Sequence, residues 1–520
     1  MCYFTLKFCN VSSVSAPTRD VSRSESSTLL RFRRQFLLTP RAVELPGWQH
    51  ERVGDHNVYA HPELGLTVHR SDADVTLVLL GFAIDPDHPE HDDAAVLELL
   101  AADRRRGSEQ ATIDRLSGRF VLFVFDGPDL HVQTDAVGAR AVEYTWTGDE
   151  FHAASQSFLL AEAVSLADSG RRAVFAGSRH AQLDREAFLP ADVTLFDQVH
   201  RLIPNHRLDV TERRQVRVWP VEPVAQTTLE EAAGFAAGQL SASLEAASFR
   251  FPLSLPLTAG YDSRALLAAT PRSRRSRVFV YTLLYRHLGR LSADPHIASR
   301  VARRAGVQHH LVDCRGLPGA EWRRLYTGNS PLAHYDDWGI IAQGMLHGLP
   351  GGHVTLKGNA SEIVRNFYWH DGAAPPTRDA ADILALHSGW SELPFVVDAV
   401  EHWFEATAPI ARASGVAIDD LFYWEHRCGS WQAQSQLEWD IAQEAFMPFG
   451  NRRMLARLLG VPARERADHG QALLREIMRV TDAEVLELPF NPSGGGYRAV
   501  DVFLKARHRA RRELRRLRAT

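Results

Sequence analysis

Short apolar segments separated by turn residues recur between about residues 34 and 219 of the chain. Turn sequences such as 126–128 (Asp-Gly-Pro) and 148–149 (Gly-Asp) bound most of these segments. This pattern is typical of strands in a mainly antiparallel sheet. Strands are predicted over 35–38, 66–69, 75–83, 120–125, 130–134, 141–146 and 151–154, and helices over 91–100 and 157–167.

A different pattern follows a linker over 220–227, which contains Pro220 and Pro223. Apolar strand-like runs now alternate with helical periodicity, and such alternation predicts βαβ units with a parallel sheet. Ligands of these sheets bind at the carboxyl ends of the strands. From about Ala380 onward the chain is mostly helical. The predicted elements before that point are helices over 229–247, 294–305 and 341–347 and strands over 253–257, 277–284, 309–312 and 354–356.

The turn at 257–263 carries the clearest chemistry, because it joins an apolar strand to a helix that opens at Ala265. Such a turn presents backbone N–H groups and the positive end of a helix dipole to an anion. Thr258 and Ser263 add hydroxyl groups, and Asp262 can hold Mg²⁺ against phosphate oxygens. No Lys follows Gly260 as a Walker A loop requires, so the turn suits pyrophosphate. The alternative is that Asp262 and Ser263 only cap the helix.

The composition of the 520 residues is that of a globular protein, with 45% hydrophobic and 23% charged residues and a net charge of −4. We therefore expect no nucleic acid as partner, and the Arg-rich stretch 502–518 is interpreted as a solvated terminal helix. The four cysteines show no CxxC pair, which suits a reducing cytoplasm. No segment has the length or order of a membrane span or signal peptide. The only lysines are Lys7, Lys357 and Lys505.

Several motifs in the same order resemble the asparagine synthetase family over nearly the whole chain. The pyrophosphate turn resembles that family's Ser-Gly-Gly-x-Asp-Ser loop. The other matching segments are 116–120 with Asp126, 135–140 with Tyr144, 151–155, 194–206, 278–283, 301–310 and 447–455. The resemblance implies an α/β protein with a glutaminase-like antiparallel domain over 34–219 and a synthetase domain over 228–520. That second domain would be an adenine-nucleotide α-hydrolase-like, doubly wound parallel sheet with a helical C-terminal part. Ahead of the two domains, the Ser-, Thr- and Arg-rich stretch 10–30 predicts a flexible lead-in over 1–33.

The family's second phosphate-side motif falls at 357–362, where Glu362 replaces an Asp. The resemblance implies that Asp262 and Glu362 clamp Mg²⁺ and, with Lys357, act in catalysis. Glu362 is alternatively an ordinary helix-start Glu, and Lys357 a solvent-facing residue at a strand end. The residues that the resemblance implies for ATP binding are Leu257, Thr258, Ala259, Gly260, Asp262, Ser263, Tyr281 and Gly358.

The glutaminase motifs depart from the family. Its nucleophile is an N-terminal Cys, which implies Cys2 here, but Tyr3 and Phe4 replace the Gly-Ile that should follow. The oxyanion-hole Asn-Gly falls at Leu80 and Gly81, so one donor is missing. The glutamine-binding Arg-Gly-Pro-Asp motif has no counterpart. The polar insert after Asn10 makes 34–38 the first strand, and we predict a glutaminase fold without its activity.

The synthetase motifs depart as well. The Glu that lies beside the family's substrate amine falls at Asn359, so aspartate does not follow as substrate. The family's C-terminal Lys should lie in 488–498, which contains none, leaving Arg498 or Lys505 as replacements. The segment 423–431 predicts either an acceptor pocket or buried core with paired charges. The cluster 334–337 has poor geometry for a metal.

These observations predict an ATP-dependent ligase that activates a carboxylate as an acyl-adenylate for attack by ammonia or an amine. ATP and Mg²⁺ are the expected cofactors, the carboxylate belongs to a small molecule or a peptide, and a homodimer is left open. Three alternatives remain: a glutamine-hydrolysing asparagine synthetase, a synthetase that closes a β-lactam or macrolactam within one substrate, and a non-catalytic scaffold of the same fold.

Overall fold

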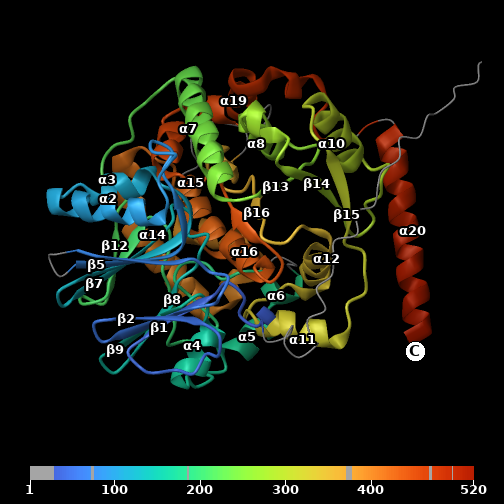
Figure 1. Cartoon of the computed structure of the whole chain (residues 1–520). Helices are drawn as coiled ribbons and strands as arrows, with labels where there is room; N and C mark the ends of the chain where they lie inside the picture. Colours follow the sequence, from blue (N-terminus) through green and yellow to red (C-terminus); the bar gives the residue numbers. More distant parts are fainter. Residues whose placement is uncertain are drawn as a thin grey trace, which may run out of the picture.

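The computed structural model describes residues 29–519, apart from 72–74, 184–186, 370–377, 468–470, 493 and 495. Its N-terminal part holds two six-stranded antiparallel sheets, as the alternating pattern predicts (Figure 1). The first sheet has the order β10 (His200–Arg201), β8 (Glu143–Thr147), β9 (Glu150–Ala154), β1 (Phe36–Thr39), β3 (His56–Ala60), β2 (Gln49–Val53). The second has the order β12 (Arg214–Arg217), β11 (His206–Asp209), β7 (Asp129–Thr134), β6 (Ser117–Asp126), β5 (Val75–Ile84), β4 (Leu66–Arg70).

The two sheets pack face to face through a shared apolar layer. Phe36 of the first sheet and Phe123 of the second meet edge to face, with ring centroids 6.0 Å apart. Because side chains alternate along a strand, β5 buries Val78 in this layer and Leu79 on its opposite face. That opposite face is covered by α2 (Asp93–Arg106) and α3 (Glu109–Arg115), while α4 (Ser157–Val164) packs on β8 and β9 of the first sheet.

Most of the predicted strands are confirmed, but β2, β3 and β10–β12 were not predicted. β2 reads Gln-His-Glu-Arg-Val and lies at a sheet edge, so its exposed polar positions hide the apolar alternation. The predicted lead-in over 1–33 lies outside the described residues up to position 28. Phe32, by contrast, is buried, and its N–H donates to Asn329 Oδ1 at 2.9 Å.

The C-terminal part is built on a five-stranded sheet in which every pair is parallel, as the strand–helix alternation predicts. The central strand is the first in sequence, and the chain crosses to its other side after the third. The crevice between β13 and β16 is therefore the topological switch point, where open α/β sheets bind ligands. The strand order is β15 (His309–Asp313), β14 (Phe279–Leu284), β13 (Leu253–Pro256), β16 (Val354–Leu356), β17 (Glu444–Phe446).

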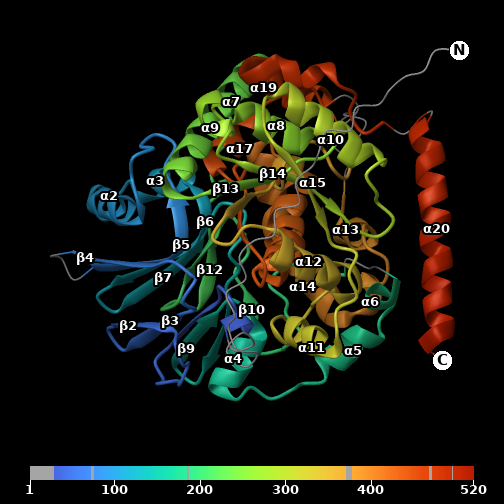
Figure 2. The ribbon, with the colours of Figure 1, turned by 45° about the vertical axis from the view of Figure 1, so that its right-hand side comes forward.

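Helices cover both faces of the parallel sheet (Figures 1 and 2). One group consists of α7 (Leu229–Arg250), α8 (Tyr261–Ala269), α9 (Arg272–Arg275), α10 (Ala293–Arg304), α17 (Arg452–Leu459), α18 (Ala463–Arg466) and α19 (Ala472–Asp482). Below the sheet in Figure 1 lie α11 (Ala320–Gly328), α12 (Ile340–Gly348) and α16 (Ala433–Trp439). The remaining helices are α5 (Arg171–Gly177), α6 (Arg179–Leu183), α13 (Ala380–Ala385), α14 (Pro394–Ser414), α15 (Ile418–Phe422) and α20 (Gly496–Ala519).

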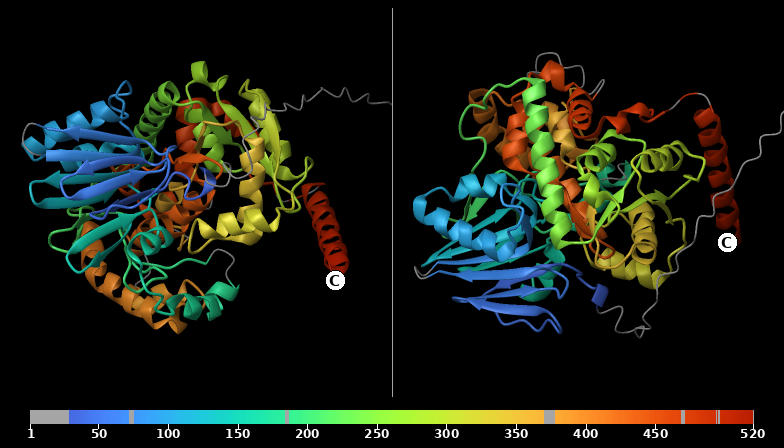
Figure 3. Two further views of the ribbon diagram at one scale, coloured as in Figure 1. Left: turned by 60° about the horizontal axis from the view of Figure 1, so that its bottom comes forward. Right: turned by 45° about the horizontal axis from the view of Figure 1, so that its top comes forward.

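The antiparallel strands end at Arg217 and α7 begins at Leu229, which matches the predicted linker. The division into two domains nevertheless stays a prediction, because one apolar cluster contains Leu37 and Tyr59 of the first part with Leu255 and Leu257 of the second. The long helix α7, green in Figure 3, runs along the junction of the two parts. The basic helix α20 lies at the outer edge (Figure 2). Within the described ranges, no helix combines the length and apolarity that a bilayer span requires.

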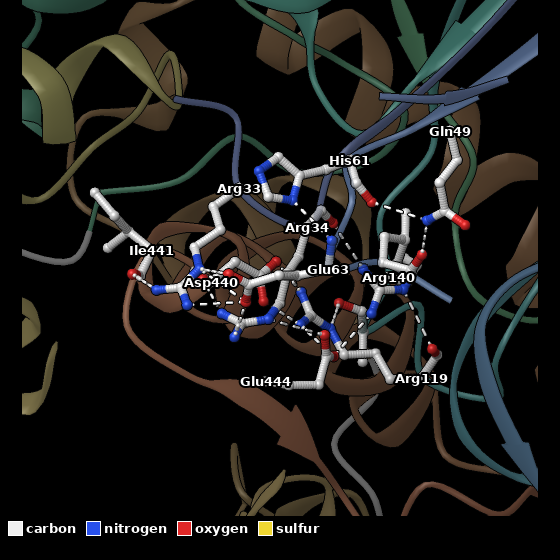
Figure 4. Close-up of polar contacts among 12 residues, drawn as sticks. Arg33, Arg34, Gln49, His61, Glu63, Arg119, Arg140, Asp440, Ile441 and Glu444 are labelled. Atoms are coloured by element: carbon white, nitrogen blue, oxygen red, sulfur yellow. Dashed lines mark hydrogen bonds and ion pairs between the residues drawn. The ribbon is translucent and has the colours of Figure 1, made fainter. Parts of the chain in front are cut away.

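A buried ion cluster joins the two parts (Figure 4). Arg119 of β6 pairs with both Asp440 and Glu444, and Arg140 donates to Glu444 at 2.8 Å. Arg34, just before β1, donates to the carbonyl oxygen of Asp440 and lies 3.7 Å from Glu444. Burial alone would raise the pKa of Glu444, but the guanidinium groups of Arg140, Arg119 and Arg34 together lower it below its ordinary value.

We predict that Glu444→Gln destabilises the protein by about 3–5 kcal/mol at pH 7, because it removes the carboxylate partner of the buried Arg140 and one of the two partners of Arg119. The folded pKa lies below the ordinary 4.5, so the contribution is present above pH 4.5 and is lost as the pH falls through the folded pKa. Urea unfolding at pH 7 and pH 4 measures both effects. The control is Glu150→Gln, which breaks an exposed pair with Arg41 and should cost less than about 1 kcal/mol. Equal losses in the two variants would contradict this account.

Candidate active site

The turn at 257–263 lies at the switch point of the parallel sheet. Its first residue is fixed by the neighbouring strand: the Leu257 N–H donates to the Tyr281 carbonyl at 2.7 Å, and the Thr282 hydroxyl donates to the Leu257 carbonyl at 2.6 Å. The turn then delivers the chain into α8. Gly260 is the N-cap and supplies no side-chain cap bond, while Asp262 and Ser263 lie inside the first helical turn. Neither residue is therefore the N-cap itself, and the alternative that they only stabilise the start of the helix stays open.

The N–H groups of the turn bond to its own side chains and to one neighbour. The Thr258 N–H donates to Ser263 Oγ at 3.1 Å, and the Gly260 N–H donates to Thr258 Oγ1 at 3.0 Å. The Ala259 N–H donates to Asp294 Oδ1 at 2.9 Å, across from α10. The hydroxyl groups of Thr258 and Ser263, which the sequence predicts to bind an anion, thus stabilise the turn itself. An anion that binds here would replace them as acceptors of these N–H groups.

The second predicted loop, 357–362, packs directly against the first. A Cβ atom added to Gly358 would lie 2.5 Å from the Cβ of Asp262, so only glycine allows this approach. The Ser361 hydroxyl donates to Asp262 Oδ1 at 2.5 Å. Ala360 has φ +74°, a left-handed conformation that costs an L-residue energy and that clusters at functional sites. The loops 257–263 and 357–362, which are about 100 residues apart in sequence, therefore form one surface.

Arg365 connects the two predicted metal ligands. Its guanidinium lies 3.6 Å from Asp262 Oδ1 and 3.5 Å from Glu362 Oε1. Burial raises the pKa of Glu362 to about 7, a shift that Arg365 opposes and the Asp262 charge reinforces. The second carboxylate oxygen of Glu362 is buried without a hydrogen-bond partner among the described residues. An oxygen-only set with an unsatisfied carboxylate fits Mg²⁺, which binds one or two carboxylates together with phosphate oxygens. Sequence reasoning missed Arg365, because only folding brings it to Asp262.

Lys357 is buried at the carboxyl end of β16, so the solvent-facing alternative is wrong. The backbone N–H of Lys357 donates to the Phe446 carbonyl at 2.7 Å, and the side-chain ammonium lies 4.5 Å from the Trp439 ring centroid. Burial lowers the pKa of Lys357 to about 7, and no charged partner among the described residues contributes to the shift. An amine in this state can change its charge near neutral pH.

Two small pockets of about 260 Å³ each flank the turn. The first opens at the start of α8 and is lined by Asp262, Arg365 and Gln471. The second lies over the ends of β13 and β14 and is lined by Thr258, Thr282 and Trp439, among others. Tyr281, predicted to bind the nucleotide, lines neither pocket: its side chain is fully buried in the core, and its carbonyl supports the turn.

The segment 485–491 closes over the turn, where the sequence predicts a loop near the site. Arg264 is fully buried and donates to the Leu488 carbonyl at 2.9 Å. Phe490 stacks on Tyr261 with centroids 4.0 Å apart, and the Asn491 N–H donates to the Ala259 carbonyl at 3.1 Å. Arg498 and Lys505, the predicted replacements for a catalytic Lys, are carried by α20 at the outer edge and line neither pocket.

The helical segment Tyr423–Gln432 is buried core with paired charges, the second of its two predicted interpretations. Glu425 is fully buried, pairs with Arg217 of β12, and accepts from Trp403 Nε1 at 2.8 Å. Burial opposes ionisation, but Arg217 and His206 lower the pKa of Glu425 to about 2. The segment 334–337, for which the sequence predicts poor metal-binding geometry, makes ion pairs with other residues. His334 lies 2.7 Å from Glu438, and Asp337 pairs with Arg286.

The predicted glutaminase region holds structural arginines. The first strand begins at Phe36, with residues 29–35 described ahead of it, as the polar insert predicts. Cys2 lies outside the described residues. A Cβ atom at Gly81 would come within 2.7 Å of Arg140 Nε and still closer to the Arg119 carbonyl oxygen. Arg140 and the backbone of Arg119 therefore lie directly against Gly81, where the resemblance implies an oxyanion hole.

No protein-family model matches the chain, and no curated protein does so either. One similar solved structure is described as the allosteric regulatory enzyme of purine biosynthesis; it has 13% identity and a TM-score of 0.25, and the match covers 58% of this chain and 73% of that one. A second is glutamine phosphoribosylpyrophosphate amidotransferase from B. subtilis, complexed with ADP and GMP, with 11% identity, a TM-score of 0.24, and 58% and 66% coverage. At these TM-scores the likeness carries no argument.

We predict that Gly358→Ala disrupts the contact between the two loops, because the added methyl group overlaps Asp262. Overpacking of this kind typically costs about 1–3 kcal/mol. Thermal unfolding measures the loss. Gly351→Ala is the matched control, since a Cβ there meets nothing within 4 Å. Equal melting temperatures in the two variants would show that the close approach of Gly358 to Asp262 does not contribute to stability.

Proposed function

We propose that this protein is an ATP-dependent amide-forming ligase of the asparagine synthetase type. A substrate carboxylate oxygen attacks the α-phosphorus of ATP, forming an acyl-adenylate and releasing pyrophosphate. The nitrogen of ammonia or an amine then attacks the acyl carbon, loses a proton, and expels AMP. The carboxylate belongs to a small molecule or a peptide.

The observation that carries the proposal is the meeting of the two motif loops at the switch point of the parallel sheet. Asp262, Gly358 and Ser361 are in contact there, although they come from loops that follow different strands. The small pockets on either side of the turn offer separate room for a nucleoside and for its phosphates. A sheet of this kind binds its ligand in such a crevice.

Asp262 and Glu362 would hold Mg²⁺, which supplies charge stabilisation for the departing pyrophosphate when bound. Arg365 contributes a fixed positive charge next to both carboxylates. Lys357 supports the phosphate side as a buried amine, and Trp439 holds its ammonium group. The Arg140 side chain at Gly81 favours a ligase that does not hydrolyse glutamine, so ammonia or an amine comes from elsewhere.

A second candidate is a non-catalytic scaffold of the same fold. It is favoured by the turn itself, in which Thr258, Ser263 and Asp294 already occupy the N–H groups of 258–260. A turn braced in this way keeps its shape without an anion. The two candidates differ in whether ATP is cleaved.

The products of ATP test the proposal. The protein is incubated with Mg²⁺-ATP, hydroxylamine as nucleophile, and a pool of free amino acids and tryptic casein peptides. We expect AMP, pyrophosphate and hydroxamates, with a loss on the order of 10²-fold in Asp262→Asn, as for removal of a group that stabilises developing charge. Asp398→Asn, an exposed site on α14, is the control. ADP as product, or equal rates in the two variants, would contradict the proposal.

The Lys357 amine gives a prediction that needs no substrate. It is charged below pH 7 and neutral above, since its pKa lies at about 7. We expect ATP without Mg²⁺ to bind about tenfold more weakly at pH 8.5 than at pH 6 in the wild type, because Lys357 loses a positive charge while Glu362, whose pKa is also about 7, gains a negative one. Lys357→Met should flatten this dependence, and Lys505→Met on the exposed part of α20 should not. Fluorescence titration with ATP at the two pH values measures this dependence. A pH dependence of ATP affinity in Lys357→Met equal to that of the wild type would contradict the prediction.

A further inference from the structure

A cavity of about 1130 Å³ lies between the antiparallel part and the parallel-sheet part. One wall comes from α5 and α6, including Arg172, Ala173 and Phe175. The opposite wall comes from α11 and from the short π-helix Tyr335–Gly339 before α12, including Trp338 and the preceding His334. Figures 1 and 2 both show α5, α6 and α11 side by side below α12. Pockets for drug-sized ligands measure about 300–1,000 Å³, so this cavity has room for an occupant larger than a free amino acid.

The cavity adjoins the pocket over β13 and β14. Arg286 and Trp338 line both spaces, so a molecule in the cavity can reach towards Thr258 of the turn. Arg286 has φ +50°, and its guanidinium pairs with Asp337 at 2.5 Å. A strained residue with a salt bridge at this junction is typical of a functional position.

The lining carries both signs of charge as well as apolar surface. Arg172 stacks on Phe158 with 4.8 Å from its guanidinium carbon to the ring centroid, and no carboxylate among the described residues pairs with it. A stacked guanidinium keeps its N–H groups available for a carboxylate. The apolar and aromatic part of the wall includes Phe175, Leu332 and Trp338.

A lining with charges of both signs and apolar surface does not suit a ligand that is entirely apolar or entirely anionic. An acyl chain offers no hydrogen-bond acceptor to the guanidinium of Arg172, which stacks on Phe158 in the lining. A polyanion would meet Asp168 and Asp337. A peptide segment carries polar, charged and apolar groups in alternation and satisfies both kinds of surface.

We infer that this cavity binds a peptide segment, with the carboxylate to be activated directed past Arg286 and Trp338 towards the turn. The inference rests on the proposed function for the activation step, whereas binding of the peptide itself requires no ATP. The antiparallel part thus contributes α5 and α6 as a wall of the substrate site.

The test is retention of a synthetic library of eight-residue peptides, each with one glutamate, on immobilised full-length protein, beside free glutamate and aspartate. Arg172→Ala removes the guanidinium that stacks on Phe158, and Ala173→Trp fills the cavity from an exposed helix position. Arg105→Ala and Ala413→Trp make the same changes at exposed sites outside the cavity. ATP binding by the same preparations verifies folding and tests the nucleotide site separately.

We expect the wild type and both control variants to retain peptides but no free amino acids, and both cavity variants to retain at least tenfold less. Two results would overturn the inference and leave the proposed function standing: a wild type that binds ATP but no peptide, or peptide retention unchanged in Ala173→Trp. Peptide retention that depends on the cavity in a protein that binds no ATP would support the peptide site and contradict the proposed function.

Discussion

The structure depends on one buried ion cluster. In it, Arg34, Arg119 and Arg140 of the antiparallel part face Asp440, which directly follows α16, and Glu444, the first residue of β17. Charges taken out of water must find partners with good geometry, so the cluster is satisfied only when the two parts dock in one arrangement. It fixes β17, which pairs with β16, and β16 carries Lys357 and Gly358 into the site. The geometry of the candidate site, which follows β16, therefore depends on the ion pairs that Glu444 makes at the start of the neighbouring strand β17.

This linkage gives the antiparallel half a structural role in the fold. Its arginines neutralise carboxylates of the other half, and its β12 supplies Arg217 to the buried Glu425. Its helices α5 and α6 form one wall of the cavity of about 1130 Å³. The antiparallel half thus supports the parallel sheet and forms one wall of the cavity beside it.

Sequence reasoning succeeded where the determining forces are local. The strand, turn and helix at 253–269 were predictable because apolar alternation, a small-residue turn and helical periodicity follow one another directly. It failed for β17, three residues between helices whose placement depends on Arg119 and Arg140, more than 300 residues away. Arg365 was missed for the same reason, because its partner Asp262 lies on another loop. The burial of Lys357 depends on Trp439, a contact that spacing cannot reveal.

The central claim is that Mg²⁺-ATP binds along the turn at the switch point of the parallel sheet. Calorimetric titration of Mg²⁺-ATP into the wild type, Asp262→Ala and the exposed-site control Asp398→Ala tests it most directly. The account predicts binding by the wild type and the control, and binding at least tenfold weaker in Asp262→Ala. A wild type that binds no ATP, or an Asp262→Ala variant that binds it equally well, would contradict the claim.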